Sequence, residues 1–199
     1  KELRVASIEF ISKTAKKQNI FLFNSITGGI ILDGPSFQIN AFDSIIEDFK
    51  GSAISNSNNS MHHTNNIDLM AERSDILSKD GTVLHLNTVR CSDSIFTGKI
   101  AVEQREHENN WIRYSRYEAG SKLPVIRING ELRQAAFKCT TDLPIFVSKL
   151  SESPYYLCLD DMCSQRIIAG GENSLSMGTY NKSYNTKQME ILKTRLKEY

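Results

Sequence analysis

Four cysteines are the residues of this chain whose spacing says most about possible chemistry: Cys91, Cys139, Cys158 and Cys163. Cys158 and Cys163 flank the dipeptide Asp160-Asp161. If that dipeptide is a two-residue turn, the two cysteines form a non-hydrogen-bonded pair of a hairpin, where a disulfide is geometrically feasible. Cys91 and Cys139 each end a predicted strand and could form a second disulfide, although two other pairings are open. The alternative is four reduced, partly buried thiols in a cytosolic protein.

A cysteine nucleophile is a second use of the same residues. Cys91 as thiolate and His107 as general base would form the minimal pair of such a site, with a nearby acidic side chain to orient the imidazole. A zinc site is not expected, because the spacing between Cys158 and Cys163 is one residue longer than in the usual zinc knuckle and no second spaced pair accompanies it. The sequence therefore predicts neither a metal nor another cofactor.

Aromatic and arginine side chains gather in one short stretch and could bind a ligand or a protein partner. Rings beside guanidinium groups can stack on bases or on an anionic ligand, and they are also typical of interaction hot spots. Neighbouring glutamates cancel the charge of this stretch, and a two-faced strand would explain the same pattern. The candidate binding residues are Trp111, Arg113, Tyr114, Arg116 and Tyr117.

The overall charge and composition narrow the classes of partner. The chain has 199 residues, 24 Lys plus Arg, 23 Asp plus Glu, and a net charge of +1. This balance gives no reason to expect nucleic acid as a partner, and no apolar run approaches the ~18 residues of a membrane span. Since the chain begins with Lys1, a signal or tether could lie outside it. We expect a protein or small-ligand partner, and membrane attachment only through such a tether.

Apolar spacing predicts three amphipathic helices, over about residues 2–17, 40–50 and 185–199. The segment 51–66 is rich in Asn and Ser, so it is predicted to be a flexible loop without site residues, His62 and His63 included. From Thr82 onward, alternating apolar and polar residues predict antiparallel strands.

One hairpin in this sheet carries a clear turn signal, Asn129-Gly130. A three-residue loop would pair Ile128 with Leu132 on one face of the hairpin, and this register is preferred over a two-residue turn.

These elements predict an α+β fold, an antiparallel sheet with helices at both ends and near residues 40–50, in a single domain of residues 1–199 without internal repeats. At the level of fold alone, this arrangement resembles pilin-like subunits and the extracytoplasmic sensing domains of bacterial membrane receptors.

The leading functional hypothesis is a non-catalytic extracytoplasmic or secreted domain that binds a ligand or partner, as part of a membrane-tethered sensor or a surface assembly. One alternative is a secreted or translocated enzyme that uses Cys91 and His107. Another is a cytosolic scaffold or assembly protein with reduced thiols. The pairing and accessibility of the cysteines separate these three classes.

Overall fold

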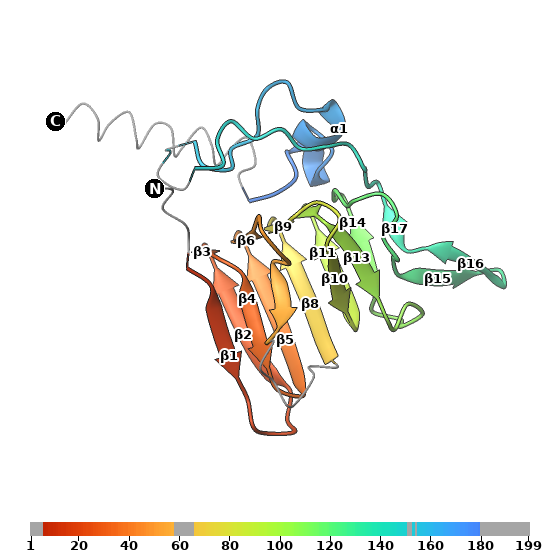
Figure 1. The fold of residues 1–199 in the computed structure, drawn as a ribbon. Helices are drawn as coiled ribbons and strands as arrows, with labels where there is room; N and C mark the ends of the chain where they lie inside the picture. Colours follow the sequence, from red (N-terminus) through yellow and green to blue (C-terminus); the bar gives the residue numbers. More distant parts are fainter. Residues whose placement is uncertain (1–5, 58–65, 151–152, 154, 180–199) are drawn as a thin grey trace.

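The chain winds into a parallel β-helix, in which successive coils add strands to three faces (Figure 1). This computed structural model describes residues 6–57, 66–150, 153 and 155–179. Within these residues, helical structure is limited to α1 (Gln165–Ile168) and a 3-10 turn, η1 (Glu172–Ser174). The predicted α+β fold with an antiparallel sheet and amphipathic helices is therefore wrong.

The broadest face is a six-stranded parallel sheet that runs the length of the coil. Its strands, in spatial order, are β2 (Gln18–Phe23), β5 (Ser36–Phe42), β8 (Asn66–Glu72), β11 (Thr88–Ser92), β14 (Trp111–Arg113) and β17 (Ala136–Phe137).

The second face is a four-stranded parallel sheet of β3 (Ile26–Thr27), β6 (Ile45–Asp48), β9 (Asp75–Ser78) and β12 (Ile95–Thr97). The third face consists of two shorter parallel sheets. One contains β1 (Ile8–Ile11), β4 (Ile30–Asp33) and β7 (Ile54–Asn56), and the other contains β10 (Val83–Leu86) and β13 (Lys99–Val102).

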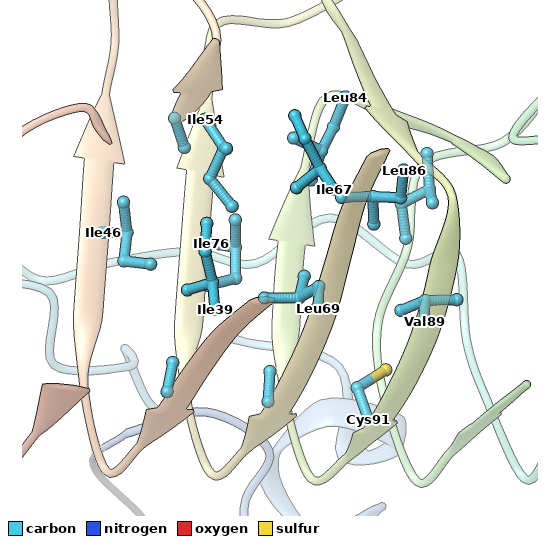
Figure 2. Close-up of a cluster of buried hydrophobic side chains, with 14 of the residues drawn as sticks. Ile39, Ile46, Ile54, Ile67, Leu69, Ile76, Leu84, Leu86, Val89 and Cys91 are labelled. Carbon is cyan, nitrogen blue, oxygen red and sulfur yellow. The ribbon is translucent and has the colours of Figure 1, made fainter. Parts of the chain in front are cut away.

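The interior of the coil is filled by aliphatic side chains stacked in register (Figure 2). Ile39, Leu69 and Val89 are Cα partners on successive strands of the six-stranded sheet, and each is 2 % exposed or less. Each such side chain contributes about 1.5–3 kcal/mol on leaving water. Because every coil supplies the same inward positions, the core is continuous along the axis.

A repeated corner joins the six-stranded sheet to the four-stranded sheet. At each corner one residue has a positive φ, between 45° and 53°, and the next residue is a serine. The positive φ turns the chain sharply where a continued strand would run straight on. The residues at this position are Asn24, Asp43, Arg73, Asp93 and Tyr114, followed by Ser25, Ser44, Ser74, Ser94 and Ser115.

The corner serines form a ladder of hydrogen bonds along the coil axis. The Ser74 N–H donates to the Ser94 hydroxyl at 3.2 Å, and the Ser94 hydroxyl donates to the carbonyl of Ser92 at 2.8 Å. The same pair of bonds recurs at each serine from Ser25 to Ser94. In the last coil Cys139 takes the serine position, and its thiol donates to the Phe137 carbonyl.

This ladder is an internal repeat that the sequence analysis missed. The serines lie 19, 30, 20 and 21 residues apart, so insertions between coils hide the period. The prediction that the chain has no repeats is wrong.

Two helix predictions failed, and a corner explains the one at residues 40–50. In the segment 40–50, Asp43 has a φ of 48° and forms the corner between the end of β5 and the start of β6. Ile46 points into the coil, and Ile45 points outward and is buried there too. Because apolar residues lie on both faces of this strand, their spacing resembled the apolar face of a helix. Within 2–17, residues 8–11 form β1 and no helix follows. The predicted helix at 185–199 lies outside the described residues.

The predicted loop at 51–66 is also corrected in part. Ala53 and Ile54 are buried in the core, and Ile54 begins β7. Asn66 opens β8. Residues 58–65, with His62 and His63, lie outside the described residues.

The hairpin at Asn129-Gly130 is confirmed, but the preferred register is wrong. β15 (Val125–Ile128) and β16 (Glu131–Gln134) pair Ile128 with Glu131 around a two-residue turn. Asn129 and Gly130 both have positive φ, 51° and 86°, which suits a type I′ turn. Nearly every side chain of the hairpin is exposed, so no buried face selected the register that we expected.

A C-terminal segment covers the outer face of the four-stranded sheet (Figure 1). We call residues 141–179 the cover segment; residues 151, 152 and 154 of it lie outside the described part. Its Leu157, Ile167 and Met177 pack on Ile45 and Ile95 of the sheet. This face is therefore apolar on both sides, unlike an ordinary half-exposed sheet.

One carboxyl group is buried beneath the cover segment. Asp75 lies between Ile45 and Ile95 in the sheet and is 1 % exposed, and its Oδ1 has no hydrogen-bond partner in the described part of the chain. Burial raises its pKa to about 7, against hydrogen bonds from Thr179 that lower it. A Cβ on Gly178 would lie 2.4 Å from Oδ1, so the cover segment packs directly on this group.

Removing one rung of the serine ladder should destabilise the coil. Ser94→Ala leaves the buried N–H of Ser74 without its acceptor, and we expect a loss of about 1–3 kcal/mol in the free energy of unfolding by urea titration. The exposed Ser7 provides a control, and Ser7→Ala should change stability by less than about 0.5 kcal/mol. Equal effects of the two substitutions would contradict a structural role for the ladder.

Asp75 should make stability fall as the pH rises. Its folded pKa is raised above the ordinary value of 3.8, so the folded state holds a proton that the unfolded state has lost, and stability declines between about pH 4 and pH 7. Asp75→Asn should remove roughly 2–3 kcal/mol of the change in unfolding free energy between pH 5 and pH 8. Asp161→Asn, at an exposed position, should leave that change as in the wild type.

Candidate functional site

A polar groove crosses the outer face of the six-stranded sheet near the N-terminal ends of its strands. It has a volume of about 350 Å³. Strands β5, β8 and β11 form its floor, and the connection between β13 and β14 forms one wall. Its lining residues are Lys17, Gln38, Asn66, Asp68, Asn87, Thr88, Arg90, Gln104, His107 and Asn109.

The acidic side chain of the groove, Asp68, is held in its ionised form. Burial opposes ionisation, but hydrogen bonds from Lys17, Thr88 and Asn87 outweigh it and lower the pKa of Asp68. The Thr88 hydroxyl donates to Oδ1 at 2.6 Å and the Asn87 amide donates to the same oxygen at 3.1 Å. Lys17 forms an ion pair with Oδ2, so the negative charge of this carboxylate is already balanced.

The wall of the groove is fixed to the sheet by one buried amide. Asn110 is 4 % exposed; its Oδ1 accepts the N–H of Val89 at 2.8 Å, and its Nδ2 donates to the carbonyl of Gln104. A turn then brings His107 and Asn109 to the groove, with the Asn109 N–H donating to His107 Nδ1 at 3.2 Å. The wall is thus built from the same coil contacts as the sheet.

Arg90 is the cation of the groove whose charge is not balanced within the described residues. It lies on β11 with its side chain outward and half-buried. Among the described residues no carboxylate forms an ion pair with it, whereas Lys17 is paired with Asp68. The groove therefore offers one guanidinium group to a ligand.

Aromatic rings lie on the same outer face, on both sides of the groove; those of Phe21 and Phe23 are exposed and that of Trp111 is half-buried. Phe21 and Phe23 are 59 % and 58 % exposed, and the Phe23 ring stacks on Phe42 of the next coil with centroids 5.2 Å apart. On the other side, the Trp111 ring lies beside Arg90 in strand register, and the guanidinium of Arg113 lies 4.6 Å from its centroid.

The structure separates the residues predicted to bind as a group. Trp111 and Arg113 do share the outer face. Tyr114 occupies a corner, where the Lys138 ammonium lies over its ring. Arg116 is buried, 2 % exposed, and its guanidinium donates to the carbonyls of Asp142 and Phe96.

Tyr117, the fifth residue of that group, packs against the interior cluster. The predicted set is therefore one surface pair and three residues in structural positions.

Cys91 and His107 are not brought together. The Cys91 side chain is fully buried among the interior aliphatic residues (Figure 2), and His107 is exposed on the outer wall of the groove. Burial raises the pKa of Cys91 well above its usual range, which disfavours the thiolate that a nucleophile requires. This geometry gives no support to the cysteine-nucleophile hypothesis.

All four cysteines are free thiols in the structure. The predicted hairpin around Asp160-Asp161 does not form, because Leu159 bridges Phe146 and the Cys163 thiol lies against the backbone of Ile145. The predicted disulfides therefore find no geometric support here.

Sequence reasoning missed the groove because its residues share no motif. They become visible once the corner serines are aligned. Counting six residues back from each serine gives a column of small polar side chains, which we call the polar row: Asn19, Gln38, Asp68, Thr88 and Asn109.

Two further hollows lie outside the groove. One, of about 700 Å³, lies between Gln104–His107 and the exposed hairpin of β15 and β16. The other, of about 460 Å³, lies between Lys138–Thr140 and the cover segment. Neither contains a row of side chains repeated from coil to coil.

The described residues contain no group of three His, Cys, Asp or Glu side chains arranged to hold a metal ion. In the same part of the chain, no helix has the length and apolar character needed to cross a membrane.

Thiol labelling checks the burial of the cysteines. In native protein at pH 8, iodoacetamide should leave Cys91 unmodified and should modify Cys139 slowly, since burial raises the pKa of Cys139 to about 11. All four should react in urea, as read by peptide mass spectrometry. Rapid native labelling of Cys91 would contradict its placement and revive the nucleophile hypothesis.

Comparison with protein-family models, with curated proteins and with solved structures finds no match to this chain. A fold alone does not determine a function. The function is therefore argued from the geometry of the groove and the face around it.

Proposed function

We propose that this protein is a non-catalytic ligand-binding domain that holds a saccharide in the polar groove of its six-stranded sheet. The observation that carries this proposal is the lining of the groove, in which five of the ten residues are Asn or Gln.

Amide side chains suit a ligand rich in hydroxyl groups. Each amide offers both a donor and an acceptor, and each hydroxyl also donates and accepts, so the two can pair in several orientations. The side chains of Asn66, Gln104 and Asn109 have no hydrogen-bond partner among the described residues and so are available for such pairing. The exposed ring of Phe21 and the half-buried ring of Trp111, on the same face, can pack against the C–H surfaces of sugar rings.

The state of Asp68 favours binding over catalysis. A carboxylate that accepts hydrogen bonds from Lys17, Thr88 and Asn87 is stabilised in its ionised form and makes a poor general acid at neutral pH. It orients its neighbours and supplies an acceptor. We assign it the role of organising the groove floor.

An extracytoplasmic or secreted location remains a prediction from the sequence. Free thiols lend it no support, and the resemblance to pilin-like subunits and sensing domains no longer applies, because it assumed an antiparallel fold. A saccharide ligand is consistent with a protein that acts at or outside a cell surface. We retain the cytosolic scaffold hypothesis as the alternative. The free thiols favour it, whereas the groove gives no argument for it.

A glycan array followed by calorimetry with the retained glycan tests the proposal. The double variant Gln38→Ala and Asn109→Ala removes two amides from the groove and should weaken binding by about 30-fold, the effect of two hydrogen bonds of about 1 kcal/mol each. Gln165→Ala, an exposed amide on the cover segment, is the matched control and should bind as the wild type does.

Two results would contradict the proposal. One is the absence of any glycan retained by the correctly folded wild type. The other is binding that the double variant and the control leave equally unchanged, since this would place the glycan elsewhere on the surface.

A further inference from the structure

The groove repeats its chemistry along the coil axis. Gln38, Asp68 and Thr88 are Cα partners on β5, β8 and β11, so their side chains project side by side. Adjacent strands are about 4.8 Å apart. Asn109 occupies the equivalent position of the next coil, two residues before Trp111, and continues the polar row.

A regular row of polar groups suits a ligand that is itself regular. A single sugar would use one or two coils of the groove and leave the others empty. A linear chain of sugars laid along the axis would meet a new polar side chain at every coil, with a period of about 4.8 Å. The exposed Phe21 ring and the half-buried Trp111 ring extend this surface beyond both sides of the groove.

The charge of the groove adds a second requirement. Lys17 is neutralised by Asp68, which leaves Arg90 as the guanidinium without a carboxylate partner in the described residues. A guanidinium group binds planar carboxylates and sulfates through charge-assisted hydrogen bonds, which are stronger than neutral ones. A neutral saccharide would leave this half-buried charge unpaired.

We propose that the ligand is a linear acidic saccharide that lies along the coil axis, with one anionic group bound by Arg90 and the adjoining sugar ring packed beside Trp111. This inference rests on the proposed function, because it specifies the ligand of the same groove.

The same observations argue against nucleic acid as the occupant. A nucleic acid chain carries a phosphate on every unit and is held by several cations. The groove provides one unbalanced cation, and its floor contains the carboxylate of Asp68. An anionic group on one or a few units of a hydroxyl-rich chain fits this distribution better.

Matched pairs of oligosaccharides test the charge requirement. Hexamers of galacturonic, mannuronic and glucuronic acid are compared by calorimetry with their methyl esters, and a sulfated neutral hexamer distinguishes sulfate from carboxylate. We expect at least one acidic hexamer to bind at least about tenfold more tightly than its uncharged counterpart. Arg90→Gln should abolish that difference, and Arg133→Gln, which removes an exposed arginine of the hairpin, should preserve it.

Chain length tests the orientation. Gln38 and Asn109 lie at opposite ends of the groove, about 14 Å apart if three strand spacings separate them. For a hexamer along the axis, Gln38→Ala and Asn109→Ala should each weaken binding, and affinity should rise from dimer to tetramer. An affinity that is the same for the dimer and the hexamer would overturn the axial arrangement.

The outcomes separate this inference from the proposed function. Equal binding of acidic and neutral hexamers, or a charge preference that survives Arg90→Gln, would overturn the acidic ligand while leaving a saccharide-binding groove in place. Failure of every saccharide to bind the folded wild type would overturn both. Circular dichroism of each variant establishes that its fold is intact before its binding is interpreted.

Discussion

The hydrogen-bonded corner after each strand of the six-stranded sheet is the constraint on which the rest of the structure depends. A non-glycine residue with positive φ costs on the order of 1 kcal/mol or more, and the chain accepts this cost at Asn24, Asp43, Arg73, Asp93 and Tyr114. Two consecutive N–H groups at each corner find acceptors in the next coil. At the second corner, Asp43 donates to the Glu72 carbonyl and Ser44 to the Ser74 hydroxyl. The corner therefore sets both the turn and the register of neighbouring coils.

Once the register is set, the three faces of the coil have different surroundings. The interior is mostly apolar, and the outer face of the four-stranded sheet is buried by the cover segment. That second interface includes Asp75, a carboxyl group whose ionisation opposes docking, so a rise in pH disfavours the packing of the cover segment. The outer face of the six-stranded sheet is left open across all its strands. It is the broadest regular surface that the described residues present to a ligand.

The sequence allowed the hairpin at Asn129-Gly130 to be predicted, although not its two-residue turn, and it did not reveal the architecture. The strands have only two to seven residues and end at the corners. The alternation of inward apolar and outward polar residues is therefore interrupted before it can be recognised as a strand pattern. At Ile45 and Ile46 both faces of the strand are buried, so the apolar residues there had the spacing of an amphipathic helix. The insertion between Ser44 and Ser74 lengthened one repeat to 30 residues and obscured the ladder. Of the residues that line the groove, only His107 was singled out from the sequence, and then as a general base. Trp111 and Arg113 were predicted to bind and lie on the same face, but the groove itself is defined by residues aligned across coils.

The ladder and the groove use separate positions of the same repeat, and this separation has a functional consequence. The serine fixes the coil, the residues three and five positions before it fill the interior, and the residues two, four and six positions before it face outward. Outward positions can change identity without disturbing the ladder or the core, because their side chains take part in neither.

One outward position shows the variety that such freedom would produce. Four residues before each corner serine, the chain has Phe21, Asn40, Met70, Arg90 and Trp111. The polar row departs from this variety, since every one of its five members is polar and can form hydrogen bonds. Part of this row is used within the molecule, where Thr88 donates to Asp68, and we propose that the rest of it serves the ligand, with Arg90 binding the anionic group.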